Sequence, residues 1–370
     1  MKYKVIHQLL HTLSYGDAIS GEAIALKRYF ESKGIASEIY ALNIDPKFKG
    51  YAKSFKEIDK NFTGAVILHY SLGSPLNNLY RSLSNAKKYL IYHNLTPYQW
   101  FEGINPRIVS DIKEGFVELP SLCETSDYLI ADSEFNAGEI AKLGFKAEVV
   151  ELPLDPERWN VEANSGIDAL LKSNGKLNIM SVGRLAPNKC VEDIIKSFYF
   201  LHHKIDRNSH LWLSGIDIDT EIYSFALKRL VYELSLQDAV SFVGRFVDSE
   251  LKALYQNADL YVCMSEHEGF CMPVVEAMYF GVPVVAYDSS ALPYTVKDAG
   301  ILINQKSHPI IAELMYKAAR DTELKSKLIS AGKNRVKELS YENFTTQLNS
   351  IFIQGESKSS QNPISEAIQA

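Results

Sequence analysis

The chain has 370 residues, of which 46% are hydrophobic and 23% are charged, and its formal net charge is −6. This length exceeds what one hydrophobic core usually supports, so two domains are expected. The acidic balance argues against a general nucleic-acid binder, which presents a basic surface. The four cysteines form no C-x-x-C pair, which fits a reducing compartment and offers no metal-site spacing.

The N-terminal segment is predicted to be a strand and not a signal peptide, because its apolar run is short and is broken by His7 and Gln8. No apolar run is long enough to span a bilayer. A cytoplasmic protein is therefore expected, and peripheral contact with the inner membrane face is left open.

Short apolar runs alternate with segments of helical period along the first half. Strands are predicted at residues 3–9, 36–40, 65–69, 88–92, 128–132 and 147–151. Helical patterns lie between them, notably at residues 21–33 and 134–143. Such alternation predicts a mostly parallel sheet with helices on both faces.

The alternation restarts after a polar stretch at residues 161–175, which is the predicted linker. Strands are predicted at residues 177–182, 210–214, 240–243, 260–264, 282–287 and 301–303. Helices are predicted at residues 192–203, 221–235, 248–256, 274–280, 310–317, 324–339 and 341–352. The α/β chain is thus divided into two doubly wound domains, residues 1–160 and 176–340, with ligands expected beyond the carboxyl ends of the strands. The Ser/Gln/Asn-rich tail, residues 355–370, is predicted to be disordered.

The most informative motif is E-x7-E, from Glu268 to Glu276. Gly269 stands between a predicted buried strand and a helix, where free N–H groups and the positive helix end favour an anionic or hydroxyl-rich ligand. Two carboxylates beside such a turn are costly unless they accept hydrogen bonds from neutral donors. Sugar and ribose hydroxyls are such donors, so the motif indicates a nucleotide-sugar ligand.

The chain resembles the family-4 retaining glycosyltransferases of the GT-B fold, the group 1 glycosyl transferases. The resemblance rests on the E-x7-E motif, on Gly183-Arg184-Leu185 with Lys189, and on Phe242-Val243-Gly244; residues 281–285 and 298–300 extend it. It is dense in the C-terminal half and thin in the N-terminal half. It implies two Rossmann-like domains facing across a cleft, with the last helix, residues 341–354, joining the N-terminal, acceptor-side domain. The C-terminal domain would bind the donor.

The resemblance implies a donor site in the C-terminal half. Arg184 and Lys189 would bind the donor diphosphate, where fixed cations strengthen their hold as negative charge develops on the leaving group. Glu276 would accept hydrogen bonds from the ribose hydroxyls, and Glu268 would approach hydroxyls of the donor sugar.

The turn between the two glutamates would present backbone N–H groups to the sugar and phosphate. Its residues are Gly269, Phe270, Cys271 and Met272. Cys271 departs from the family pattern, which often has glycine there. Phe246 would stack on the base, although packing in the core is an equal alternative for this residue.

In the N-terminal half, the resemblance implies that Gly16 contacts the donor phosphate across the cleft. His93, after a predicted strand, would donate to a sugar hydroxyl or phosphate. Asp17, His69 and Ser133 are weaker acceptor-side candidates. Helix capping is the alternative for Asp17, and a buried, hydrogen-bonded histidine is the alternative for His69.

No metal and no cofactor are predicted. The triplet Asp217-Ile218-Asp219 matches the D-x-D pattern that holds a divalent metal in the other major glycosyltransferase fold, but such triplets occur by chance in any acidic chain. A GDP- or UDP-linked sugar would be a substrate.

The predicted function is transfer of a hexose, mannose or glucose, from a nucleoside-diphosphate sugar to a hydroxyl of a glycan or lipid-linked acceptor, with retention of configuration, in surface polysaccharide biosynthesis. His93, Glu268, Arg184 and Lys189 would be the catalytic residues. Two alternatives stay open: a GT-B nucleotide-sugar epimerase, and a non-catalytic nucleotide-sugar-binding protein. The sequence indicates no oligomeric state.

Overall fold

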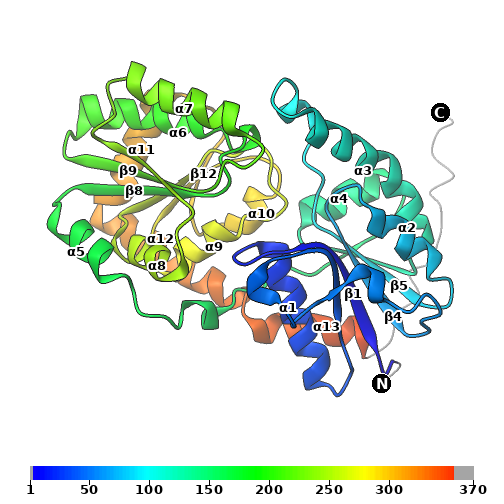
Figure 1. Ribbon diagram of the computed structural model, residues 1–370. Coiled ribbons are helices and arrows are strands. Elements are labelled where there is room, and N and C mark those ends of the chain that lie inside the picture. The colour runs from blue at the N-terminus through cyan, green and yellow to red at the C-terminus, as the bar shows by residue number, and fades with distance from the viewer. Residues whose placement is uncertain (1–2, 354–370) are drawn as a thin grey trace, which may run out of the picture. The chain divides into compact units, whose positions relative to one another are not determined.

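The computed structural model describes residues 3–353 and contains two compact units (Figure 1). The first unit takes the chain up to Tyr98, residues Arg107–Pro153 and the residues from Leu339 onward; the second takes Gln99–Pro106 and Leu154–Glu338. The tail that was predicted to be disordered, residues 355–370, lies outside the described residues.

The first unit is built on a seven-stranded parallel sheet in the order β3-β2-β1-β4-β5-β6-β7. Its strands are β1 (Ile6–Leu13), β2 (Ile39–Ile44), β3 (Lys53–Ser54), β4 (Ala65–Tyr70), β5 (Lys87–Tyr92), β6 (Tyr128–Ala131) and β7 (Glu148–Val149). Its helices are α1 (Ala18–Ser32), α2 (Pro75–Ser82), α3 (Pro106–Thr125), α4 (Glu134–Lys142) and α13 (Tyr341–Phe352).

Helices cover both faces of this sheet. Buried side chains of α2, α3 and α4 pack on one face, and those of α1 and α13 pack on the other. The ring centroid of Phe352 in α13 lies 4.8 Å from that of Tyr89 in β5 and 5.1 Å from that of Phe30 in α1. The last described helix therefore completes the core of the first unit.

The second unit is built on a six-stranded parallel sheet in the order β10-β9-β8-β11-β12-β13. Its strands are β8 (Leu177–Val182), β9 (Ser209–Ser214), β10 (Val240–Gly244), β11 (Leu260–Cys263), β12 (Val284–Tyr287) and β13 (Ile301–Ile303). Its helices are α5 (Ser165–Ser173), α6 (Val191–Phe200), α7 (Glu221–Glu233), α8 (Asp248–Asn257), α9 (Met272–Tyr279), α10 (Leu292–Val296), α11 (His308–Arg320) and α12 (Thr322–Glu338).

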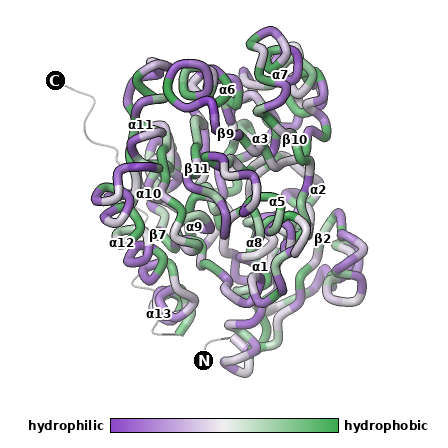
Figure 2. The backbone as a smooth tube through the Cα atoms, turned by 90° about the vertical axis from the view of Figure 1, so that its left-hand side faces the viewer, coloured by the Kyte–Doolittle hydropathy of each residue, from purple (hydrophilic) through white to green (hydrophobic). Residues whose placement is uncertain are grey.

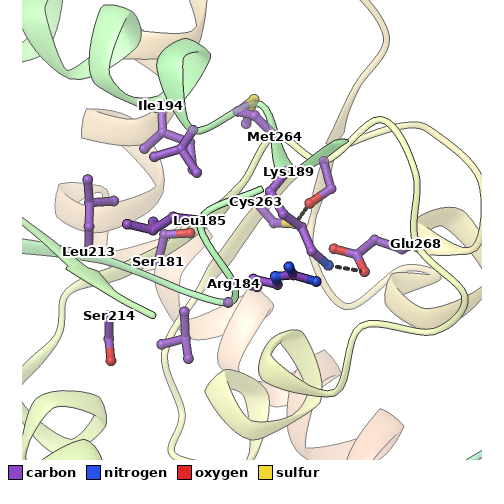
Figure 3. Close-up of a pocket in the computed structure, with 14 residues that line it drawn as sticks. Ser181, Arg184, Leu185, Lys189, Ile194, Leu213, Ser214, Cys263, Met264 and Glu268 are labelled. Carbon is purple, nitrogen blue, oxygen red and sulfur yellow. Dashed lines mark hydrogen bonds and ion pairs between the residues drawn. The ribbon is translucent and has the colours of Figure 1, made fainter. Parts of the chain in front are cut away.

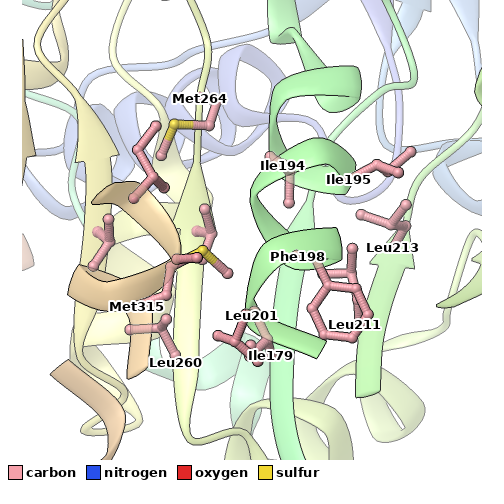
Figure 4. Close-up of a cluster of buried hydrophobic side chains, with 14 of the residues drawn as sticks. Ile179, Ile194, Ile195, Phe198, Leu201, Leu211, Leu213, Leu260, Met264 and Met315 are labelled. Carbon is pink, nitrogen blue, oxygen red and sulfur yellow. The ribbon is translucent and has the colours of Figure 1, made fainter. Parts of the chain in front are cut away.

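The core of the second unit follows from helical and strand periodicity. Ile194, Ile195 and Phe198 lie on one side of α6 and pack against Leu211 and Leu213 of β9 (Figure 4). Helices α6, α7 and α11 cover this face, while α8, α9 and α10 cover the other. The strands, as at β11, are hydrophobic stretches, whereas α12 is largely hydrophilic (Figure 2).

The predicted linker at residues 161–175 differs from the structure, because it contains α5. Asn164 caps this helix, and Asp168 accepts a hydrogen bond from Asn257 of α8 at 2.9 Å. Leu171 is the one residue of α5 that is buried, so the polar run marks the exposed side of a docked helix. The chain passes between the units at residues 153–154.

Strand β3 and helices α2, α3 and α10 were not predicted. Gly115 and Pro120 obscure the helical period of α3, and β3 has only two residues. Within residues 3–353, no helix combines the length and the apolar character that a bilayer crossing requires.

Candidate functional site

The second unit has a pocket at the point where the order of its strands reverses. The chain leaves β8 toward β9 on one side and enters β11 on the other, so the loops after β8 and β11 diverge there. Ligands of doubly wound sheets bind at such points, beyond the carboxyl ends of the strands. Arg184, Lys189 and Glu268, predicted to bind the donor, all line this pocket (Figure 3).

Lys189 and Glu268 form an ion pair in the pocket. The Nζ atom of Lys189 lies 2.6 Å from Oε2 of Glu268. Burial by itself would lower the pKa of Lys189, but the carboxylate of Glu268 raises it above its ordinary value, so the ammonium group stays charged. The pocket therefore holds a fixed cation with a carboxylate that can exchange partners.

Arg184 is held by the loop that contains the D-x-D triplet. Its Nη2 atom donates to the carbonyl oxygen of Ile218 at 2.6 Å. The half-buried guanidinium keeps further donors, because a guanidinium carries five N–H groups. In this structure, residues 217–219 thus position the cation of the pocket.

Two further contacts fix the relative positions of these loops. Asn188 donates from Nδ2 to the carbonyl of His267 at 3.0 Å, and its own carbonyl accepts from the N–H of Glu266 at 2.9 Å. The N–H of Glu268 donates to Oγ of Ser290 at 2.8 Å. Asn188 and Ser290 were missed by the sequence analysis.

Helix α9 begins directly after the Gly269 turn. Cys271 has φ 80° and ψ 66°, which is the left-handed region that favours glycine. The glycine that the family often has here fits that backbone without strain. Phe270 is buried, and its carbonyl accepts from Oγ1 of Thr295 at 2.6 Å; Met272 is the first residue of the helix.

Glu276 lies on α9 in a separate hydrogen-bond cluster. Its Oε1 atom accepts from Nη1 of Arg158 at 2.5 Å, and its Oε2 atom accepts from the hydroxyl of Tyr255 at 2.9 Å. Burial raises the pKa of this carboxyl, although Arg158 opposes the shift. Arg158 also pairs with Asp248 at 3.0 Å. Phe246 is partly buried and packs against the neighbouring core.

Arg158 and Tyr255 were also missed by the sequence analysis. Arg158 is 118 residues from Glu276 in the sequence, and no local pattern marks it as a partner. A carboxylate has about four acceptor positions. Glu276 therefore keeps acceptor capacity beyond the two contacts it makes here.

The predicted site residues of the first unit lie at the carboxyl ends of its strands. Gly16, φ 75°, makes the turn between β1 and α1. Asp17 caps α1 by accepting from the N–H of Ser20 at 2.9 Å, and Ser133 caps α4. His93 is buried: its Nδ1 atom lies 3.2 Å from Asp132, and its Nε2 atom lies 2.9 Å from Nδ1 of His69.

The structure thus gives several predicted residues an internal role. Both ring nitrogens of His93 face protein groups, and its predicted contact with the donor sugar stays a prediction. The contact predicted for Gly16 and the acceptor-side roles of Asp17, His69 and Ser133 likewise stay predictions.

Comparison with known proteins identifies a family match in the second unit and several similar proteins. Residues 166–335 match the family model described as glycosyl transferases group 1. The chain is 28% identical over 167 residues to the O-antigen chain mannosyltransferase B of Escherichia coli, covering 45% of this chain and 43% of that relative. It is 36% identical over 110 residues to the mannosylfructose-phosphate synthase of Agrobacterium fabrum, covering 29% and 24%. The chain therefore spans less than half the length of these relatives.

Solved structures resemble nearly the whole chain. The crystal structure of Anabaena HepE in complex with UDP and glucose superposes with a TM-score of 0.71 at 16% identity, covering 94% of this chain and 99% of that one. WaaG, a glycosyltransferase involved in lipopolysaccharide biosynthesis, gives 0.71 at 12% identity, covering 95% and 100%. These likenesses confirm the expected GT-B fold with its two α/β units.

Proposed function

We propose, from the match of residues 166–335 to the group 1 glycosyl transferases, that this chain is a retaining hexosyltransferase. It moves a hexose from a nucleoside-diphosphate sugar, UDP- or GDP-linked, to a hydroxyl of a glycan or lipid-linked acceptor in surface polysaccharide biosynthesis. The mannosyltransferase and the lipopolysaccharide glycosyltransferase among its relatives support the hexose and this setting.

One observation carries the proposal: two cations and a carboxylate share one pocket at the reversal of strand order. Arg184 and Lys189 suit the diphosphate of a nucleotide sugar, because their attraction grows as negative charge develops during departure. Glu268 suits the sugar hydroxyls, which are neutral donors. In this structure, Oε2 of Glu268 lies 2.6 Å from Nζ of Lys189. When the donor binds, its diphosphate replaces Glu268 as the partner of Lys189.

The bonding changes balance without another reactant. The bond between carbon one of the hexose and the diphosphate oxygen breaks, and a bond from the acceptor oxygen to the same carbon forms on the same face. The acceptor proton passes to an oxygen of the departing diphosphate. Lys189 and Arg184 hold that diphosphate, and Glu276 uses its remaining acceptor positions for the ribose hydroxyls.

The test begins with binding. The purified full chain is screened by thermal unfolding against UDP-, GDP- and ADP-sugars, since a ligand at about a hundred times its Kd adds about 2.7 kcal/mol. The stabilising donor is then incubated with candidate acceptors, and the product's anomeric configuration is determined. We expect one nucleotide to stabilise the protein and hexose transfer to retain configuration.

Arg184→Ala supplies the mutational arm of the test. It should lower turnover by about 100-fold or more, as the loss of a donor to a developing anion does. Arg229→Ala is the matched control, because Arg229 is an exposed arginine of α7 that pairs with Glu233 of the same helix. Unaltered turnover in Arg184→Ala, or inversion of configuration in the product, contradicts the proposal.

A further inference from the structure

The first unit contains a buried cluster of polar side chains at the carboxyl ends of its strands. His69 comes from β4, His93 follows β5, Asp132 follows β6, and Glu22 comes from α1. The side chains of Glu22, His69 and His93 are each at most 1% exposed. Groups sealed from water in this way must satisfy one another.

Backbone and carboxylate partners determine which ring nitrogens carry hydrogen in this cluster. Gln8 donates from Nε2 to the carbonyl of Ala23 at 3.0 Å, so its Oε1 atom faces His69. That oxygen lies 2.9 Å from Nε2 of His69 and can only accept, so Nε2 of His69 carries a hydrogen.

The second ring is oriented by Asp132. Its Oδ2 atom lies 3.2 Å from Nδ1 of His93, and its Oδ1 atom accepts from Nδ2 of Asn136. The carboxylate is an acceptor, so Nδ1 of His93 carries a hydrogen as well. The two outer nitrogens are thereby accounted for.

The inner atoms are then three acceptors that converge on one point. Nδ1 of His69 and Nε2 of His93 are 2.9 Å apart, and Oε2 of Glu22 lies 3.6 and 3.3 Å from them. Among the described residues, this oxygen has no hydrogen-bond partner of adequate geometry. Lone pairs this close in a dry interior repel one another, so a proton or a metal ion has to lie between them.

A proton and a metal ion are the two cations to compare. The three atoms could hold a metal, but tetrahedral zinc with bonds near 2.0–2.1 Å needs ligand atoms about 3.3 Å apart. The nitrogens are closer than that, at 2.9 Å, which is the length of a hydrogen bond. The spacing favours a proton.

We propose that this point holds a proton and that His93 is therefore an imidazolium, held between Asp132 and Glu22. His69 is its neutral acceptor. Asp132, Glu22 and His69 are positioning residues, because they keep His93 charged. The role in hexose transfer rests on the proposed function; the protonation itself does not. Both N–H groups of His93 are occupied, so it contributes a fixed positive charge and not a hydrogen bond to the sugar.

The charges around the ring agree with this assignment. Burial would lower the pKa of His93, but Glu22, Asp132 and the cap residue Asp17 together raise it above 6.5. Burial lowers the pKa of His69, which keeps that ring neutral. The proton therefore belongs to His93.

Glu22→Gln is the variant that tests this arrangement. The amide has nearly the same shape, and its own N–H can occupy the point between the rings, so the cluster no longer requires the extra proton. Glu31→Gln is the matched control, because Glu31 lies on the same helix but is 53% exposed.

The first readout is the titration of the histidine rings by nitrogen NMR on the full chain, with His93→Gln to assign the signals. In the wild type, His93 should stay doubly protonated to a pH above 6.5, while His7 and His210, whose pKa values are lowered to about 4, are neutral. In Glu22→Gln, its titration should move down by about one pH unit or more. A His93 that titrates below 6.5, or is indifferent to Glu22→Gln, overturns the proposal.

The second readout separates this proposal from the proposed function. The alkaline limb of the kcat profile should move to lower pH in Glu22→Gln and stay in place in Glu31→Gln. If Glu22→Gln lowers the titration of His93 but leaves the alkaline limb of the kcat profile in place, the positioning role is refuted. If the titration moves but the chain transfers no hexose, only the proposed function is refuted. If the purified protein contains a stoichiometric metal ion, and Glu22→Gln abolishes its binding, the proposal of a proton is wrong and the cluster is a metal site.

Discussion

Both units place polar residues at the carboxyl edge of a parallel sheet, but the exposure of the charged side chains differs between them. In the second unit, Lys189 stands on a loop, and 26% of its side chain is exposed. In the first unit, His69, His93 and Glu22 are at most 1% exposed. A partly exposed ion pair exchanges one partner for a ligand at low cost, whereas a sealed pair does not. The ion pair of Lys189 and Glu268 can therefore contact a ligand, whereas the polar groups of the first unit interact with one another.

The largest predicted effect is a loss of activity when the charge of Lys189 is removed. Lys189→Ala should lower kcat by about 100- to 1,000-fold, since one fixed donor to the developing diphosphate charge is lost. Its unfolding free energy should also fall, by about 3 kcal/mol, because the carboxylate of Glu268, which is 8% exposed, is left without its cation. Initial rates with the donor that binds, together with chemical denaturation, measure the two quantities.

Lys172→Ala is the control for that variant, since Lys172 is 66% exposed and pairs with Asp168 on the same helix. Full activity in Lys189→Ala would contradict the claim that Lys189, unlike the buried cluster of the first unit, contacts a ligand.

The cluster around Glu276 contains a second ion pair of this unit, and its exposure, 26% at Arg158 and 6% at Glu276, is close to that of Lys189 and Glu268. Arg158→Met leaves the carboxylate of Glu276 without its cation and should cost about 3 kcal/mol of unfolding free energy at neutral pH. The cost should shrink as the pH falls, because burial raises the pKa of Glu276 and a proton then replaces the lost charge. Urea denaturation across pH measures both effects.

Tyr255→Phe removes a neutral donor from the same carboxylate and should cost about 1 kcal/mol. An Arg158→Met penalty that stays constant with pH would show that Glu276 is not the group left uncompensated.

The imidazolium of His93 predicts a slope of stability with pH. Because the pKa of His93 is raised in the folded protein, the folded state holds more protons than the unfolded state above pH 6.5. Its stabilisation is complete below that value and is lost as the pH rises through the folded pKa, by at most about 1.4 kcal/mol per pH unit. Denaturation midpoints of wild type and Glu22→Gln should diverge at low pH and converge at high pH.

The smallest effect concerns the backbone at the start of α9. Cys271→Gly and Cys271→Ala both remove the thiol, but only glycine adopts φ 80° without strain. The glycine variant should therefore be the more stable of the two by about 1 kcal/mol. Thermal unfolding of the pair gives the difference directly, and equal midpoints would mean that the turn relaxes in the alanine variant.

Strands and amphipathic helices were the parts of the fold that the sequence predicted well. Strand β8 has the predicted bounds, as does α13, because each combines a clear period with flanking polar residues. Helix α3 was missed since Gly115 and Pro120 lie inside it, and α5 was mistaken for a linker because Leu171 is its one buried residue. Local signals fail where one buried residue or a tertiary contact decides the outcome.

The candidate site divides in the same way. The proximity of Lys189 and Glu268 in one pocket agrees with the motifs that place them after strands, because parallel strands bring such ends together; their role in donor binding stays a prediction. The partners of Glu276 and of His93 were not found, because Arg158 and Glu22 reach them only through the tertiary fold. The sequence therefore predicts which charged residues lie at strand ends, but it does not predict the distant residues that contact them.

The position of α13 has a consequence for how the protein is made. Its side chains Phe344, Leu348, Ile351 and Phe352 belong to the same core as Ile6 and Tyr89. A ribosome releases that helix only after the whole of the second unit, so the first unit waits for residues 341–352 while the second unit is already fully translated. Although it is made later, the second unit is the one that can finish folding first.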